Sequence, residues 1–362
     1  MIISSQIYTY KDLKEGIDLG KDDYGIAASK CRFPLQQAFS NNPYLDDDSV
    51  PFAYIGRVDG NAGGIAMWFP IKLKVGDYII NATSGSTLEV YEEYRKYGIG
   101  ADIMMYPLLT PGFNFLLYAG VSKQALKIYK KMKFTIFEYP RVMRVCKSRS
   151  IVEKYGLHGP LLTISSFICD SIIHIWYGLA SLFSKSYRQY KVQKLSVVPE
   201  WVNDMVLNDG HDYMEVHDQR WFQWNIDFNL HAEKDDKQSF YGVYKGETPI
   251  AFFVTKERFR DIAGGELKNV IIGSVMEWGI GKDQDISEAD LYKIAINTFN
   301  KKVDIMEFAT DDKSVVKAMR KHGFIQHGFS HIIFKDLSHK YKDAEDISKW
   351  RIRFGYADVL LT

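Results

Sequence analysis

Cysteine is scarce in this chain and the net charge is close to zero, and each shortage excludes classes of protein. The 362 residues include three cysteines, Cys31, Cys146 and Cys169, which lie far apart and form no C-x-x-C pair. This usage argues against a zinc site and for a reducing compartment, so we expect no bound metal and a cytoplasmic location. With 46 basic and 45 acidic residues, the chain also lacks the basic excess that nucleic acid would require.

Segments typical of secreted or membrane proteins are also few. Residues 1–6 lack a basic stretch followed by an apolar core, so we expect no signal peptide. Residues 161–183 are largely apolar, but Asp170 and His174 lie four residues apart on one helical face. A carboxylate at the bilayer centre costs roughly 2.5–3.5 kcal/mol. This favours an amphipathic connecting helix over a transmembrane span, and contact with a membrane surface or a partner chain stays open.

The most informative segment runs from Val90 to Ala101 and reads VYEEYRKYGIGA. It predicts a strand end, a turn and the start of a helix. Backbone N–H groups at a helix N-terminus lack partners and carry the positive end of the dipole, so small residues there let a pyrophosphate approach closely. Gly98 and Gly100 supply that closeness. Pro107 and Pro111 follow soon afterwards, which predicts a short helix.

A second block follows at the expected distance. Residues 117–121 read as a buried strand, and residues 122–134 read as a helix with Ala125 and Tyr129 on it. Together the two blocks resemble the V-x-P-E-Y-R-x-x-G-x-G/A and N-x-x-A-x-x-x-Y-x-x-x-G-F motifs of the GNAT acetyltransferase superfamily. The chain departs from them at Glu92 for proline, Ser122 for asparagine and Lys133 for glycine.

The resemblance implies that acetyl-CoA is a co-substrate and that its acetyl group passes to a primary amine of a small molecule. The coenzyme would lie along the strand and the glycine loop, with thioester and phosphates held by backbone N–H groups. The residues assigned to it are Leu88, Val90, Arg95, Lys96, Tyr97, Gly98, Ile99, Gly100, Ala101 and Ser122. Tyr129 would donate a proton to the leaving thiolate.

An amine is protonated near neutral pH, so a base or a water relay must take its proton before attack. Glu89 is one candidate base, because it interrupts an apolar strand and should face away from Leu88 and Val90. A solvent-facing position for Glu89 is the alternative reading, and three nearby side chains compete for the role: Asp77, Asn81 and Ser84.

Beyond a basic and polar stretch at residues 185–194, the chain repeats itself. Laying Phe324 on Phe134 places Asp312 over Ser122 and Met319 over Tyr129. A repeat of this size indicates two copies of one domain. Ser287 and Asp290 are spaced as a helix-capping pair in the second copy.

The second copy has lost the expected chemistry. Residues 279–281 imitate the glycine loop of the first copy, but Met276 stands where its arginine would be, and we interpret them as a turn. Met319 cannot donate a proton.

We therefore predict an α/β (α+β) fold of two tandem, GNAT-like mixed-sheet domains with flanking helices. Residues 1–150 form the coenzyme-binding and catalytic domain, 151–194 an apolar helical linker through which the halves pack, 195–340 the degenerate domain, and 341–362 a tail.

The acceptor is less clearly encoded. Residues 213–228 include Trp221 and Trp224, whose faces suit a sugar ring or, alternatively, a domain-interface core. An amino sugar is one candidate acceptor. Three functional classes stay open: an N-acetyltransferase, a non-catalytic acyl-CoA-binding sensor, and an aminoacyl or peptidyl transferase on the same tandem fold, whose relatives lack the glycine loop. The oligomeric state is not encoded in any pattern we identified.

Overall fold

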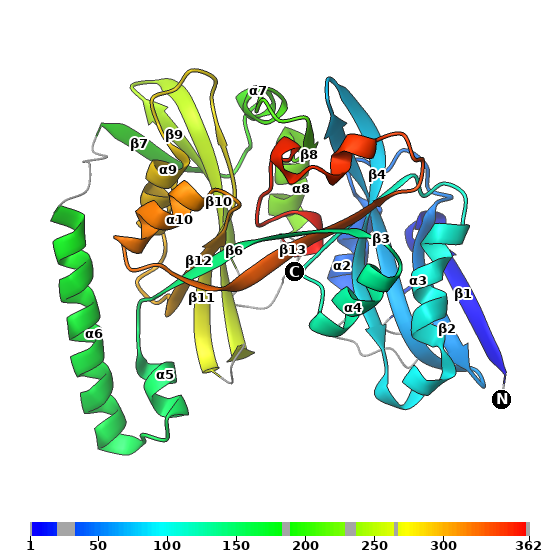
Figure 1. Cartoon of the computed structure of the whole chain (residues 1–362), viewed down its shortest axis with the longest axis horizontal. Coiled ribbons are helices and arrows are strands. Elements are labelled where there is room, and N and C mark those ends of the chain that lie inside the picture. Colours follow the sequence, from blue (N-terminus) through cyan, green and yellow to red (C-terminus); the bar gives the residue numbers. More distant parts are fainter. Residues whose placement is uncertain (1, 20–32, 183–188, 229–236, 264–266, 360–362) are drawn as a thin grey trace.

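The computed structural model describes residues 2–19, 33–182, 189–228, 237–263 and 267–359 (Figure 1). The first half consists of β1 (Ile3–Thr9), α1 (Tyr10–Lys14), α2 (Phe33–Ser40), β2 (Pro51–Val58), β3 (Asn61–Val75), β4 (Tyr78–Val90), η1 (Glu92–Tyr97), α3 (Ile99–Leu109), β5 (Phe115–Ala119), α4 (Lys123–Lys131) and β6 (Thr135–Val145). Two helices lead to the second half: α5 (Arg149–Lys154) and α6 (Gly159–Leu182).

The elements of the second half follow a similar order. It consists of β7 (Tyr190–Leu195), α7 (Trp201–Leu207), β8 (Tyr213–Glu215), α8 (Gln219–Phe228), β9 (Lys237–Lys245), β10 (Thr248–Ala263), β11 (Leu267–Ile280), α9 (Glu288–Ile296), β12 (Ile305–Ala309), α10 (Lys313–Arg320) and β13 (Ile325–Asp336). Short 3₁₀ turns end the described chain: η2 (Lys342–Glu345), η3 (Ile347–Lys349) and η4 (Ala357–Val359).

One mixed sheet runs through both halves. In the described chain its strands lie in the order β1-β2-β3-β4-β5-β13-β6-β12-β11-β10-β9-β7, and β8 pairs with β3 beside this path. The pairs β4–β5 and β11–β12 are parallel, and their neighbours are antiparallel. The helices and this sheet make the α/β fold that the sequence predicts.

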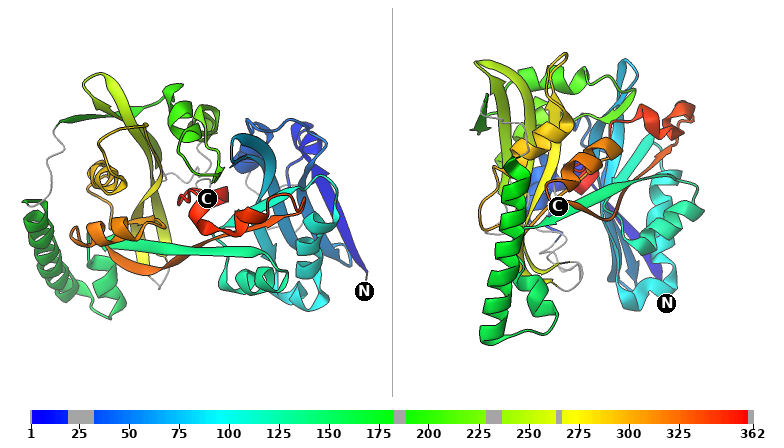
Figure 2. Two further views of the ribbon diagram at one scale, coloured as in Figure 1. Left: turned by 45° about the horizontal axis from the view of Figure 1, so that its top comes forward. Right: turned by 60° about the vertical axis from the view of Figure 1, so that its left-hand side comes forward.

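The two halves exchange a strand. β6, the last strand of the first half, pairs with β12 of the second half, while β13 pairs with β5 of the first half and with β6. Figures 1 and 2 show these two strands crossing between the halves. The prediction that the halves pack through the linker is therefore wrong, because α6 lies at the outer edge of the second half.

The predicted repeat is present. The order β2-β3-β4-α3-β5-α4-β6 recurs as β9-β10-β11-α9-β12-α10-β13. Ser122 and Asp312 are the N-caps of α4 and α10, and each side chain accepts a hydrogen bond from the backbone of its helix. Ser287 and Asp290 form the predicted capping box at the start of α9. The N-cap residues of the two copies therefore start helices at equivalent positions.

Two local details differ from expectation. Pro107 lies inside α3, which continues to Leu109, so the proline shortens this helix less than predicted. Lys133, where the motif has glycine, has a φ of +58°, and Gly323 in the second copy has a φ of +81°. The motif glycine thus marks a left-handed position, which a lysine occupies here.

Apolar clusters cover both faces of the sheet. Under α3 and α4, one cluster contains Ile103 and Tyr129, and its counterpart under α9 and α10 contains Leu291 and Met319. The largest cluster includes side chains from both halves. The shared sheet and this shared core make the halves one packed unit.

A buried charge cluster ties the C-terminal segment to the second half. His217 lies between two carboxylates, with Nε2 3.0 Å from Glu215 and Nδ1 2.9 Å from Glu277. Arg353 lies 3.2 Å from Asp209 and 3.7 Å from Glu277. Burial opposes a charged imidazole, but the two carboxylates outweigh it and raise the pKa of His217 to about 9.

Candidate active site in the first half

The glycine loop lies at the end of β4, where the chain passes through η1 into α3. Gly98 is the N-cap of α3 and has a φ of +79°. A Cβ built on Gly98 would meet no atom within 4 Å, so the surface there is open. Ala101 donates its N–H to the carbonyl of Gly98 at 2.9 Å. The N–H groups of Ile99 and Gly100 precede this first helical bond and can face an anion.

Basic and acidic side chains both flank the loop. Arg95 donates from Nε to the carbonyl of Val90 at 3.2 Å, and the Lys96 ammonium lies 5.0 Å from the centre of the Tyr97 ring. Sequence reasoning missed Asp102 in the first turn of α3, which accepts a hydrogen bond from the Tyr54 hydroxyl. Burial and this contact raise the pKa of Tyr54 to about 12. Asp102 therefore stabilises this helix end but adds negative charge beside the glycine loop.

β4 and β5 separate just before the loop. In this parallel pair, Thr83 lies opposite Leu116 and Ser84 lies opposite Leu117. Beyond Ser84, β4 carries a register shift against β3, and Thr87 has a φ of +51°. The β4 edge from residue 85 to residue 90 therefore diverges from β5 and leads directly to the glycine loop.

The Tyr118 side chain, which sequence reasoning did not single out, lies across this divergence. A Cβ built on Gly85 of β4 would lie 1.9 Å from Cε1 of the Tyr118 ring, so a side chain at position 85 would displace the ring. Tyr118 also packs on Tyr129, with ring centres 5.0 Å apart. Burial raises the pKa of Tyr118 to about 12. No sequence signal marks this contact, because it depends on how β4 and β5 are aligned.

The proposed acid and base lie on opposite faces of the sheet. Tyr129 is 3% exposed and belongs to the cluster under α3 and α4. Leu88 and Val90 pack against the same cluster, so the alternation of the strand turns Glu89 to the other face. Glu89 is partly buried. An acid on one face and a carboxylate on the other suit a reaction that takes place between them.

The second half does not reproduce the loop. Gly279 and Ile280 belong to β11, so the interpretation of residues 279–281 as a turn is wrong for two of the three. A Cβ on Gly279 would lie 2.3 Å from the Phe252 ring. The first residue of α9 is Glu288, whose pKa burial raises to about 7. A carboxylate at this helix start disfavours an anion.

The chain's own C-terminal segment occupies the corresponding divergence in the second half. β11 and β12 pair up to Ser274, and beyond it Gly355 donates its N–H to the carbonyl of Met276 at 2.9 Å. The segment then continues into η4, which lies against β4 and β5. Val359 Cγ2 is 3.4 Å from a Cβ built on Gly120, at the end of β5. The same segment thus lies beside β11 in the second half and against β4 and β5 in the first half.

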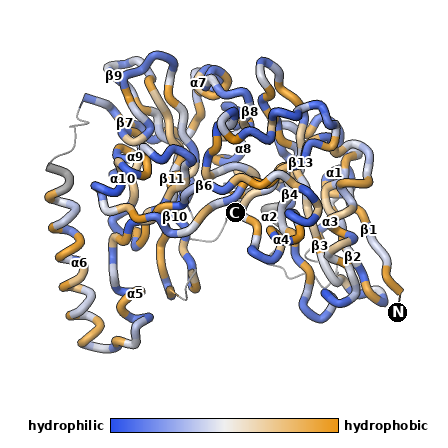
Figure 3. The backbone as a smooth tube through the Cα atoms, viewed as in Figure 1, coloured by the Kyte–Doolittle hydropathy of each residue, from blue (hydrophilic) through white to orange (hydrophobic). Residues whose placement is uncertain are grey.

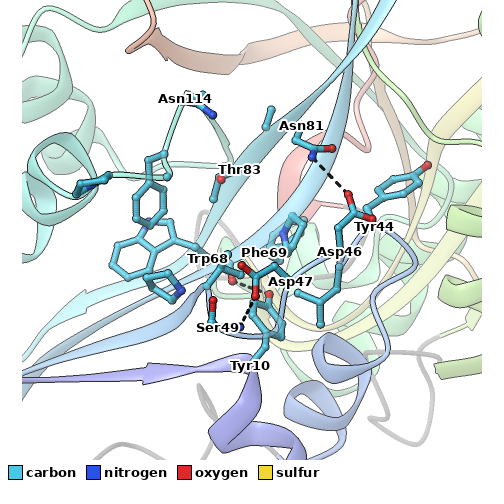
Figure 4. Close-up of a pocket in the computed structure, with 18 residues that line it drawn as sticks. Tyr10, Tyr44, Asp46, Asp47, Ser49, Trp68, Phe69, Asn81, Thr83 and Asn114 are labelled. Atoms are coloured by element: carbon cyan, nitrogen blue, oxygen red, sulfur yellow. Dashed lines mark hydrogen bonds between the residues drawn. The ribbon is translucent and has the colours of Figure 1, made fainter.

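A pocket of about 400 Å³ opens at the other end of β4 (Figure 4). Thr83 lines the pocket and also pairs with Leu116 of β5, one residue before the pairing of β4 and β5 ends. The pocket therefore lies next to the point where these strands diverge. Asp46 accepts from Asn81 at 3.3 Å and pairs with Lys72 at 3.1 Å. Asp47 accepts from the backbone of Ser49, which lowers its pKa. Tyr10, Tyr44 and Trp68 add aromatic walls.

The tryptophans that suggested a sugar site are core residues. Trp221 and Trp224 are 0% and 4% exposed and belong to the largest apolar cluster. The alternative reading of this segment as a domain-interface core is therefore correct. Among the described residues, no group of three or more His, Cys, Asp and Glu side chains is arranged to hold a metal ion.

The sequence matches no protein-family model and no curated protein. Solved structures share its fold. Saccharomyces cerevisiae N-myristoyltransferase with bound myristoyl-CoA aligns with a TM-score of 0.58 and 11% identity, over 92% of this chain and 79% of that one. A GCN5-related N-acetyltransferase from Anabaena variabilis aligns with a TM-score of 0.54 and 7% identity, over 93% and 73%.

A probable N-acyltransferase from Enterococcus faecalis aligns with a TM-score of 0.55 and 13% identity, over 97% of this chain and 75% of that one. The likeness covers both halves of the chain in all three cases. The chain therefore has the fold of these GNAT-type acyltransferases, as its two motifs predict.

Proposed function

We propose that this protein is an acyl-CoA-dependent N-acyltransferase that uses acetyl-CoA and acts in its first half. The observation that carries the proposal is the continuous path along β4. This strand diverges from β5 after Ser84 and runs into a helix start with open surface at Gly98. Such a strand edge can pair with a pantetheine arm, and such a helix start can bind phosphates. The fold shared with known N-acyltransferases supports this assignment.

In the proposed reaction, the free amine attacks the thioester carbon and the carbon–sulfur bond breaks. Glu89 takes a proton from the amine, and Tyr129 gives a proton to the thiolate sulfur. N–H groups of β4 near Leu88 hold the oxygen that gains charge. The opposite faces occupied by Glu89 and Tyr129 allow the two proton transfers to occur on the two sides of the reacting carbon.

A short acyl group is supported by the rings beneath the divergence. Tyr118 lies against Gly85, and Tyr129 and Phe134 pack on Tyr118, with ring centres 5.0 and 6.0 Å away. The Tyr118 ring therefore occupies the space beside Gly85 on this face. We therefore assign acetyl-CoA as the donor, in contrast to the myristoyl-CoA bound by the yeast enzyme named above.

The acceptor in this proposal is a small primary amine that enters the pocket beside Thr83. Asp46 and Asp47 can attract a cationic amine, and Asn81, Thr83 and the tyrosines can bind hydroxyl groups. An amino sugar has both features, although the buried tryptophans no longer support it. Amino sugars, polyamines and peptides are the panel with which to identify the acceptor.

The test measures coenzyme binding and turnover with Gly98→Glu. A carboxylate in the loop is expected to abolish acetyl-CoA binding, measured by calorimetry. Gly60→Glu is the matched control, because Gly60 has a φ of +84° in the same half and also has open space around it. Gly279 would not serve, since its substitution displaces Phe252. Loss with both variants, or with neither, would contradict the proposal.

Release of free thiol with the amine panel separates the remaining classes. An acetyltransferase binds the coenzyme and releases thiol with at least one amine. Binding without release from any amine would favour a sensor, and failure to bind coenzyme would favour an aminoacyl or peptidyl transferase.

A further inference from the structure

α6 turns an apolar face to solvent. Six side chains three or four residues apart form one row along it, the α6 row: Leu161, Ile164, Ile168, Ile172, Ile175 and Leu179. Their exposed fractions run from 53% to 64%, and Figure 3 shows the hydrophobic colouring of the helix. Monomeric proteins rarely expose contiguous apolar patches larger than roughly a few hundred Å². A row of this size therefore calls for a covering partner.

The opposite face of α6 is held by polar contacts. Ser148 donates its N–H and its hydroxyl to Oδ1 of Asp170, each at 2.7 Å. Tyr177 donates its hydroxyl to the carbonyl of Val145 at 2.9 Å, and the Arg144 guanidinium lies 3.6 Å from the centre of its ring. These contacts span two turns of the helix. They set its rotation so that the α6 row points away from the protein.

The charge around α6 is strongly one-sided. Residues 144–194 contain eight Lys and Arg residues and two acidic ones, whereas the whole chain has a net charge of +1. Exposed basic side chains lie on α5 and on β7, which Figure 1 shows near the two ends of α6. They include Arg149, Lys154, Lys191 and Lys194. This distribution is complementary to a negatively charged surface.

We propose that α6 lies in the plane of an anionic membrane surface, with the α6 row among the acyl chains and the basic residues at the headgroups. An amphipathic helix with an apolar face and basic flanks binds membranes in this way. By length and composition, Gly159–Leu179 could also cross a bilayer. Crossing would break the contacts of Asp170 and Tyr177 and bury a carboxylate in hydrocarbon. The helix therefore lies on the membrane rather than through it.

The test is flotation of the full chain with vesicles of phosphatidylcholine, with and without 30% phosphatidylglycerol. The wild-type chain is expected to float with the anionic vesicles, and less so at high salt, because salt screens the basic residues. Ile168→Glu with Ile172→Glu is expected to reduce binding more than tenfold. Thr163→Glu with His174→Glu is the control, because these exposed residues lie outside the row and change the charge equally.

Far-ultraviolet circular dichroism of each variant checks that the chain is folded, and acetyl-CoA binding should be unchanged because α6 lies far from α3 in Figure 1. Wild-type chain that fails to float, or variants that float equally, would overturn the proposal. Sedimentation that shows a dimer broken by Ile168→Glu with Ile172→Glu, without vesicle binding, would assign the row to a second copy. Resistance to alkaline carbonate extraction would indicate a spanning helix instead.

Discussion

Raising the pH from 6 to 10 is expected to remove the stability that His217 contributes. Its folded-state pKa, about 9, lies above its ordinary value of 6.5 because Glu277 and Glu215 favour the imidazolium form despite burial. A group with a raised pKa stabilises the fold fully below its unfolded pKa, and this stability is lost as the pH rises through the folded pKa. The window of loss therefore runs from about pH 6.5 to about pH 9 and beyond.

The size of the effect follows from the shift. Each pKa unit corresponds to about 1.4 kcal/mol, so His217 contributes about 3 kcal/mol near pH 6, about 1 kcal/mol at pH 8 and almost nothing at pH 10. The partners of His217 lie on β8 and β11. β8 also pairs with β3 of the first half, so His217 lies close to the point where the two halves meet.

The assay compares the free energy of unfolding of the wild-type chain and His217→Gln in urea at pH 6, 8 and 10. Glutamine does not titrate, so the wild-type advantage over the variant should fall by about 3 kcal/mol across this range. Titrating groups that do not contact residue 217 change both chains alike and cancel. An advantage that stays the same at all three pH values would refute the reasoning, and one that grows with pH would reverse its sign.

Two further predictions concern the proposed reaction. Tyr129→Phe keeps the ring that packs on Tyr118 and removes the hydroxyl, so turnover should fall by roughly 10²- to 10⁴-fold while acetyl-CoA affinity, measured by calorimetry, is unchanged; equal turnover with a rate-limiting chemical step would return this residue to a packing role. Asp47→Asn should raise the KM for the amine roughly tenfold and leave the KM for acetyl-CoA unchanged, because it removes a charge from the pocket. Asp48→Asn, outside the pocket, should leave both constants unchanged, and an equal rise with both variants would contradict the acceptor assignment.

The glycine loop and the helix starts could be predicted from the sequence because they depend on neighbouring residues. Gly98 has the left-handed backbone that a glycine allows, and Ser287 and Asp290 complete a capping box three residues apart. The same holds for the repeat, since Ser122 and Asp312 cap equivalent helices. Such features are set by interactions within one turn of chain, so their residue order is enough to show them.

The assembly of the two halves depended on contacts that residue order does not show. β6 and β13 read as ordinary strands, and only the full sheet determines that each pairs with the other half. Gly355 of the C-terminal segment donates a hydrogen bond to the Met276 carbonyl of β11. The Tyr118 ring of β5 packs against Gly85 of β4. Trp221 likewise packs in a core built from both halves.

The sequence by itself determined the GNAT-like elements, their duplication and the loss of the second glycine loop. The tertiary structure decided how the two halves share one sheet, which segment lies beside β11 beyond Ser274, and which face of α6 remains exposed. The physical reason is range: backbone φ preferences and caps act over three or four residues, whereas strand pairing and burial bring together residues more than a hundred positions apart, such as Phe115 with Asp336.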